Sequence, residues 1–191
     1  MVQEARLEAV DAGLVPASDG WFVVNVADAA WMTNEKLGAR GTFEASPRVV
    51  DGHSELAPVM FPQLGLMLDV IWPGQPNALY HAETKQEDFL VLAGECVLLI
   101  DGEERHLRAW DFVHCPPGTE HVFIGAGDGP CVIFMTGARG PDKKLRYPSS
   151  ELARNHGAGV ETETNEPREA YASFPHWQVG RPEGWDELPW R

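Results

Sequence analysis

The stretch YHAETKQEDFLVLAGE, residues 80–95, decides the fold, because a histidine and several carboxylates come directly before an apolar run. Residues two apart in a strand point to the same side, so His81 and Glu83 share one face, and Glu87 starts the next strand beside them. The run FLVL at 89–92 is typical of a buried strand. Carboxylates that face an apolar interior are costly unless they are paired or bound to a metal. Either these groups lie on a solvated turn, or several of them face inward and share a positive charge.

Short strands separated by turns extend on both sides of this stretch. From residue 64 to residue 137, apolar runs alternate with turns rich in glycine, proline and aspartate. The pair Asp101-Gly102 is a strong hairpin signal because both residue types tolerate positive φ. Strands are predicted at 64–72, 78–83, 88–93, 96–100, 103–107, 111–115, 120–126 and 131–137. Strands with this spacing predict an all-β barrel or jelly roll over residues 64–140.

The N-terminal segment, residues 1–63, lacks this regular pattern. We expect it to form an arm and an irregular segment that pack on the barrel. GWFVVNV at 20–26 alternates weakly and predicts a strand. DAAWMTNEKLG at 28–38 predicts a short helix, with Asp28 as the N-cap and Gly38 just past the end.

The C-terminal segment, residues 141–191, also departs from the strand pattern. Residues 148–157 predict a short helix, with Ser149 or Ser150 as the N-cap and Gly157 as the stop. The end of the chain is rich in proline and tryptophan and shows no periodicity. We expect this arm to be pinned to the barrel or to a neighbouring subunit by its large aromatic side chains, Trp177, Trp185 and Trp190.

The composition is that of one acidic domain with a sizeable core. The chain has 191 residues, 43% of them hydrophobic, and 15 basic against 29 acidic residues give a formal net charge of −14. Such a surface repels phosphate backbones, and the DKKLR run at 142–146 is too short to form a basic patch. We therefore expect no nucleic-acid partner.

Membrane insertion, secretion and disulfide bonding are also not expected. The most apolar window, 89–100, is too short to cross a bilayer and contains Glu95. The start of the chain has no basic region before an apolar core, so we expect no secretion signal and a cytoplasmic protein. The cysteines are widely spaced without a CxxC pair, which predicts reduced, buried thiols at Cys96, Cys115 and Cys131.

A second motif follows about 40 residues after His81, where Pro116-Pro117-Gly118 bends the chain just before His121. Together, residues 74–125 resemble the two-part signature of the cupin superfamily. The first part of that signature matches Gly74, His81-Ala82-Glu83, Glu87 and Gly94, and the second matches Pro116-x-Gly118 and His121.

This chain departs from the cupin pattern at four positions. Glu83 replaces the second histidine of the first motif, and Gly74 stands one residue too far from His81. A register that restores the spacing leaves no ligand at the second histidine position, so we prefer His81 and Glu83. In the second motif, Trp110 stands at the glycine position and Gly125 at the asparagine position.

The resemblance implies one divalent metal inside a cupin-type jelly-roll barrel, bound by His81, Glu83, Glu87 and His121. Two histidines and one carboxylate form a set that leaves coordination positions open, as in non-haem iron sites. A second carboxylate favours iron or manganese, with nickel or zinc also possible.

Other interpretations of these residues stay open at this stage. Glu83 could face solvent, orient another group or act as a general base, and Glu87 could lie on a solvated turn. His121 could be a core histidine bonded to the backbone, or all four residues could line a metal-free pocket. His106 is expected to be exposed on an edge strand, whereas His114 could face either way.

The function that follows is a single-domain cupin acting as a small-molecule metalloenzyme, of oxygenase or isomerase type, with Glu83 as its catalytic base. The alternative is a cupin that binds or senses a small ligand without turnover. Exposed sheet edges need cover, so we also expect a homodimer.

Overall fold

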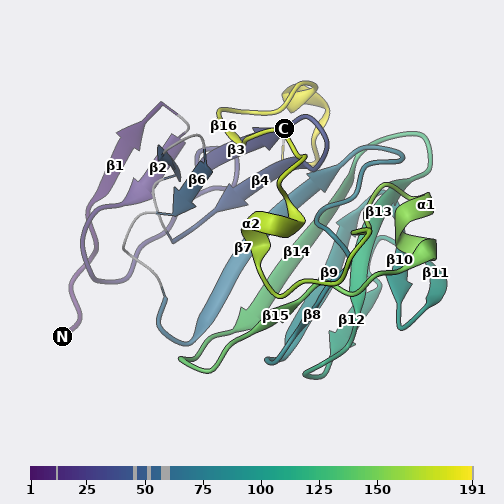
Figure 1. Ribbon diagram of the computed structural model, residues 1–191. Helices are drawn as coiled ribbons and strands as arrows, with labels where there is room; N and C mark the ends of the chain where they lie inside the picture. The colour runs from purple at the N-terminus through teal and green to yellow at the C-terminus, as the bar shows by residue number, and fades with distance from the viewer. Residues whose placement is uncertain (12, 45–46, 51–52, 57–60, 191) are drawn as a thin grey trace.

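The computed structural model describes residues 1–11, 13–44, 47–50, 53–56 and 61–190 (Figure 1). The chain is mainly antiparallel β-structure with a few short helices, which confirms the all-β prediction. None of the helices in this part of the chain has the length and apolar character needed to span a bilayer.

The N-terminal strands are short and pair mostly as hairpins. They are β1 (Leu7–Val10), β2 (Gly13–Pro16), β3 (Ala30–Asn34), β4 (Gly38–Thr42), β5 (Pro47–Val50) and β6 (His53–Leu56).

The central strands follow the predicted series closely. They are β7 (Leu64–Ile71), β8 (Ala82–Glu83), β9 (Glu87–Ala93), β10 (Glu95–Ile100), β11 (Glu103–Arg108), β12 (Phe112–Cys115), β13 (His121–Ala126) and β14 (Cys131–Ala138). The strand predicted at 78–83 is reduced to β8, because residues 76 and 81 make only isolated bridges to β13.

The C-terminal part consists of short elements joined by turns. They are β15 (Leu145–Arg146), α1 (Glu151–Asn155), α2 (Pro167–Ala170), β16 (Gln178–Val179) and the 3-10 helix η1 (Trp185–Glu187). The predicted helix at 148–157 is α1: the Ser150 hydroxyl accepts the Ala153 N–H at 3.2 Å, and Gly157 has a φ of +69°.

Two sheets face each other in a jelly-roll arrangement (Figure 1). The larger sheet has the order β12-β9-β14-β7-β4-β3-β16, and the smaller has the order β11-β10-β13. Side chains from both sheets form one buried core, which includes Ile71, Val91, Leu98, Phe123 and Ile133. The smaller sheet is also covered on its outer face, where Leu99 and Val122 pack with Ala153 of α1. Burial on both faces explains why β10 and β13 are continuous apolar runs.

The helix predicted at 28–38 is wrong, because this segment is the hairpin of β3 and β4. The Asn34 carboxamide oxygen accepts the N–H groups of Lys36 and Leu37, and Gly38 adopts a φ of +80°. Trp31 is completely buried against the C-terminal Trp185 and Trp190. Tertiary burial of the tryptophan and turn formation at Asn34 outweigh the weak helical pattern.

The strand predicted at 20–26 is also wrong, since its only ladder contact in the described residues is a bridge from Trp21 to Glu4. Instead, the N-terminal segment contributes β3 and β4 to the larger sheet, and the C-terminal segment contributes β16. Trp185 and Trp190 pin the C-terminal arm onto Trp31, as expected for this arm. The segment boundaries at residues 63 and 140 stay a prediction.

Candidate metal centre

Three of the four predicted ligands meet at one end of a cavity. His81 comes just before β8, Glu87 starts β9, and His121 starts β13. The backbones of His81 and His121 bond each other in both directions, with N···O distances of 3.2 and 2.8 Å. One ligand atom from each of His81, Glu87 and His121 lies within 4.8 Å of the other two. The fold therefore gathers two imidazoles and a carboxylate from separate β-segments.

Both imidazoles are oriented by the backbone so that Nε2 can accept. The Nδ1 of His81 lies 2.7 Å from Leu79 O, and the Nδ1 of His121 lies 3.1 Å from Thr119 O. A carbonyl oxygen only accepts, so Nδ1 carries the proton and donates, which leaves the Nε2 lone pair for a metal. Burial lowers the pKa of both histidines to about 4, so both rings are neutral at pH 7. Neutral imidazole is the form that binds metals.

Glu87 supplies the carboxylate of this group. Its Oε2 is buried, has no hydrogen-bond partner among the described residues, and lies 3.6 Å from the Nε2 of His121. Burial, followed by repulsion from the charge of Glu83, raises the pKa of Glu87 to about 8, against the opposing effect of Lys143. A buried acceptor without a donor is rare in proteins and calls for a partner. A divalent cation at this position would satisfy Glu87 and both Nε2 atoms, so the residues fit a metal.

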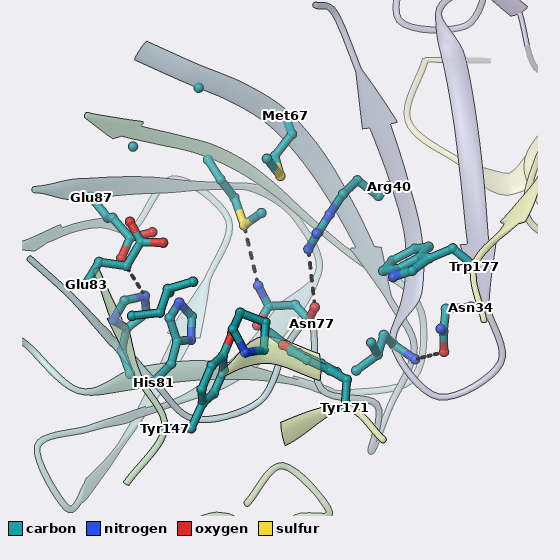
Figure 2. A pocket seen from close by; sticks show the side chains of 18 of the residues that line it. Asn34, Arg40, Met67, Asn77, His81, Glu83, Glu87, Tyr147, Tyr171 and Trp177 are labelled. Atoms are coloured by element: carbon teal, nitrogen blue, oxygen red, sulfur yellow. Dashed lines mark hydrogen bonds and ion pairs between the residues drawn. The ribbon is translucent and has the colours of Figure 1, made fainter. Parts of the chain in front are cut away.

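Glu83 faces the same cavity but has a different contact. Its side chain is 8% exposed, and the ammonium Nζ of Lys143 lies 2.5 Å from its Oε2. Figure 2 shows the carboxylates of Glu83 and Glu87 side by side above His81. Glu83 is not part of the three-residue group defined by the 4.8 Å separation. Coordination by Glu83 stays a prediction.

Acidic side chains at the start of β9 alternate between the cavity and the outer surface. Glu87 faces the cavity, whereas Asp88 accepts a hydrogen bond on the outside from His114, with 2.6 Å between Oδ1 and Nδ1. His114 is half exposed on β12, and His106 is exposed on the edge strand β11, as predicted for the latter. Inward and outward acidic groups thus alternate with the period of a strand.

The cavity has a volume of about 570 Å³ and continues well beyond the metal residues (Figure 2). Its far wall carries Arg40 from β4 together with residues from the segment after α2. These include Tyr171, Phe174, Pro175 and Trp177. A pocket of this size suits a small organic molecule.

Sequence reasoning missed the cationic and aromatic residues of this cavity. Lys143 lies in the short DKKLR run, which alone gives no sign of an inward contact with Glu83. Tyr147 is nearly buried and lies near the imidazole of His81, with ring centroids 5.9 Å apart. Arg40 lies in the stretch expected to be irregular. No spacing rule connects these positions to His81 or Glu87, so the structure was needed to find them.

The family comparison agrees with the motifs and the geometry. Residues 67–137 match the family model for the cupin domain. These residues form a cupin domain. His81, Glu87 and His121 all lie within the matched residues. No curated protein sequence matches the chain.

Solved structures similar to this cupin carry several kinds of names. A polyketide cyclase from Streptomyces resistomycificus is 14% identical, with a TM-score of 0.50 over 64% of this chain and 83% of its own. A sugar phosphate isomerase from Silicibacter pomeroyi is 27% identical, with a TM-score of 0.43 over 56% and 74%. A putative sugar phosphate isomerase from Acidithiobacillus ferrooxidans is 24% identical, with a TM-score of 0.45 over 51% and 67%. The cyclase shares the fold, and a fold of this kind hosts many reactions.

Proposed function

We propose that this cupin is a metal-dependent enzyme that acts on a small molecule, of oxygenase or isomerase type. One divalent ion would be held by His81, Glu87 and His121, with iron or manganese favoured and nickel or zinc possible. The observation that carries the proposal is the convergence of three donor groups. Two are imidazoles whose Nδ1 is bonded to the backbone, and the third is a buried carboxylate oxygen without a hydrogen-bond partner among the described residues. They lie in the wall of a cavity large enough for a substrate.

A bound ion with only three protein ligands would supply Lewis-acid chemistry, or redox chemistry if it is iron. The protein side chains set the surroundings of that ion. The rings of Phe89 and Tyr147 pack near His121 and His81, with centroid distances of 5.1 and 5.9 Å, and keep water from these sides of the imidazoles. Water exclusion strengthens electrostatic contacts inside the site.

Glu83 is the proposed catalytic base. The ammonium group of Lys143 lies against its carboxylate and holds it in place at the cavity wall. The Glu83 carboxylate borders the same cavity as the metal residues, so it can reach a bound molecule there. After accepting a proton, Glu83 could return it to another position of the substrate, as an isomerisation requires.

Metal analysis tests the proposal directly. Protein produced with iron, manganese, nickel or zinc is expected to hold about one ion per chain, and His121→Ala is expected to hold almost none. His114→Ala removes an exposed histidine of the neighbouring strand and should leave the metal content unchanged. Wild-type protein without stoichiometric metal, or unchanged content in His121→Ala, defeats the proposal. A metal with every coordination position filled and no open site would favour a ligand-binding role without turnover.

The homodimer and the cytoplasmic location expected from the sequence remain part of this proposal. Analytical ultracentrifugation of the metal-loaded protein measures the first, and a monomer at micromolar concentration would contradict it. Fractionation of the producing cells measures the second.

A further inference from the structure

The cavity wall across from the metal residues carries an arginine with unused donors. Arg40 donates from Nε to Asp69 Oδ1 at 2.7 Å, from Nη2 to Asp69 Oδ2 at 2.7 Å, and from Nη2 to Asn77 O at 3.3 Å. A guanidinium carries five N–H donors. The Nη1 group makes no hydrogen bond to any described residue, although Arg40 lines the cavity. Its two N–H groups are therefore available to a ligand.

Arg40 is held in place before any ligand arrives. The bidentate partner Asp69 is 1% exposed and also accepts from Asn77 Nδ2 at 3.3 Å. The ring of Trp177 covers the guanidinium, with its centroid 5.1 Å from Cζ. Figure 2 shows the Arg40 side chain reaching toward the cavity between Trp177 and Asn77. A fixed guanidinium loses little entropy when it binds an anion.

Tyr171 adds a second donor on the same wall. Its hydroxyl oxygen accepts the Leu79 N–H at 2.9 Å, and its own proton has no acceptor among the described residues. Burial raises the pKa of Tyr171, so the hydroxyl keeps its proton and can donate it. Tyr171 and Arg40 line the same cavity.

The cavity wall does not share the negative charge of the protein as a whole. Cationic side chains in the wall are Arg40, Arg139, Lys143 and Arg168. Three of them pair with a carboxylate, namely Asp69, Glu44 and Glu83. Arg168 is exposed and has no ion-pair partner in the described part of the chain, and its charge offsets that of Glu87, so the wall carries no net negative charge in a protein with a net charge of −14. A small anion therefore meets no surplus of negative charge inside the cavity.

We propose that Arg40 and Tyr171 bind the carboxylate or phosphate group of a small molecule whose other end lies at His81, Glu87 and His121. The position of that other end rests on the proposed function, whereas the anion site rests on the contacts of Arg40 and Tyr171 alone. Met67 and Tyr147 line the cavity along with these two ends (Figure 2), so the body of the ligand is apolar or planar. The substrate class is thus a small organic anion.

Calorimetric titration of metal-free protein with benzoate, inorganic phosphate and benzyl alcohol tests the anion site. Benzoate or phosphate is expected to bind, with a dissociation constant of about 1 mM or below, and uncharged benzyl alcohol at least about tenfold more weakly. Arg40→Lys keeps a cation for Asp69 but removes the free Nη1 donors, and it should weaken anion binding about tenfold or more. Preference for benzoate or for phosphate identifies the anionic group.

Arg139→Lys is the matched control. Arg139 also lines the cavity and pairs with a buried carboxylate, Glu44 at 2.8 Å, but both of its terminal nitrogens are engaged, the second with Phe61 O. Anion affinity in this variant should stay within about twofold of wild type. Equal losses in the Arg40 and Arg139 variants would assign binding to the general positive charge and overturn the proposal.

Tyr171→Phe provides an independent reading if Arg40→Lys fails to fold. It leaves the Arg40–Asp69 pair intact and should weaken anion binding about fivefold. No anion binding by wild-type metal-free protein at 10-fold the expected dissociation constant of about 1 mM overturns the inference. Binding that requires metal and disappears in His121→Ala overturns it as well. The titrations use metal-free protein, so their outcome is independent of the metal analysis that tests the proposed function.

Discussion

The two ends of the cavity differ in where their residues come from. The metal end uses His81, Glu87 and His121, all within the cupin match at 67–137. The far end uses Arg40, Tyr171 and Trp177, all outside that match. The cupin match thus contains the three proposed metal ligands, whereas the terminal segments carry the residues of the proposed anion site. The two ends therefore separate the proposed metal chemistry from the proposed recognition of a ligand.

The largest effect is expected at the metal end, from Glu87→Gln. Loss of the buried carboxylate removes one of three ligands, and metal affinity should fall about 100-fold or more. Glu83→Gln keeps the three-residue group and should change metal affinity by less than about tenfold while abolishing turnover. Competition with a chelator measures both affinities. Equal losses in the two variants would place Glu83 among the ligands and not at the base position.

At the far end, Arg40→Ala is expected to destabilise the fold by about 3–5 kcal/mol, because it leaves Asp69 buried and unpaired. Arg168→Ala, on the exposed part of the same wall, should change stability by no more than about 0.5 kcal/mol. Urea unfolding of metal-free protein measures both. A small effect of Arg40→Ala would mean that Asp69 finds another partner, and the far end would not be rigid.

The metal end should also set the pH dependence of the metal-free protein. Between pH 4 and 6.5 the unfolded chain binds more protons at His81 and His121, whose pKa falls from 6.5 to about 4 on folding, so stability rises with pH. Between pH 4.5 and 8 the folded chain holds an extra proton on Glu87, whose pKa rises from 4.5 to about 8, so stability falls. Up to pH 6.5 the effect of the two histidines exceeds that of Glu87, so the stability of the protein increases with pH. Above pH 6.5 only the effect of Glu87 remains, and the stability decreases.

For these three groups, stability of the metal-free protein should therefore peak near pH 6.5, the ordinary pKa of histidine. Chemical denaturation from pH 4 to pH 8.5 measures the profile. Glu87→Gln should remove the fall above pH 6.5 and leave the rise below it. A variant that keeps the fall would show that another group, and not Glu87, takes up the proton.

The smallest effect is expected outside the cavity. Ser150→Ala removes the N-cap of α1 and should cost about 1 kcal/mol of stability. Metal content and anion affinity should both stay at the wild-type level. A thermal shift accompanied by loss of either ligand would link α1 to the cavity and weaken the contrast between its two ends.

Local signals in the sequence explain which parts of the molecule could be predicted. Turn residues and alternating apolar runs identify the central strands, and the Pro-x-Gly bend with its following histidine identifies His121. The first motif selects His81 and Glu87, and the structure brings both to His121, whereas the contact of Glu83 with Lys143 was not predicted.

The far end depends on contacts between distant parts of the chain. Arg40 meets Asp69, 29 residues later, and the Leu79 N–H meets the hydroxyl of Tyr171, 92 residues later. Neither pairing leaves a periodic pattern in the sequence. The β3–β4 hairpin was predicted as a helix for a related reason, since the tryptophans that bury Trp31 lie more than 150 residues away.

Asn34, at the end of β3, also contacts the C-terminal segment. The Asn34 carboxamide, which shapes the β3–β4 turn through its oxygen, also donates from Nδ2 to Pro175 O at 2.7 Å. This hydrogen bond joins the N-terminal and C-terminal segments at the rim of the cavity. A substitution in one terminal segment can therefore shift residues of the other at the rim, although the two lie far apart in the sequence.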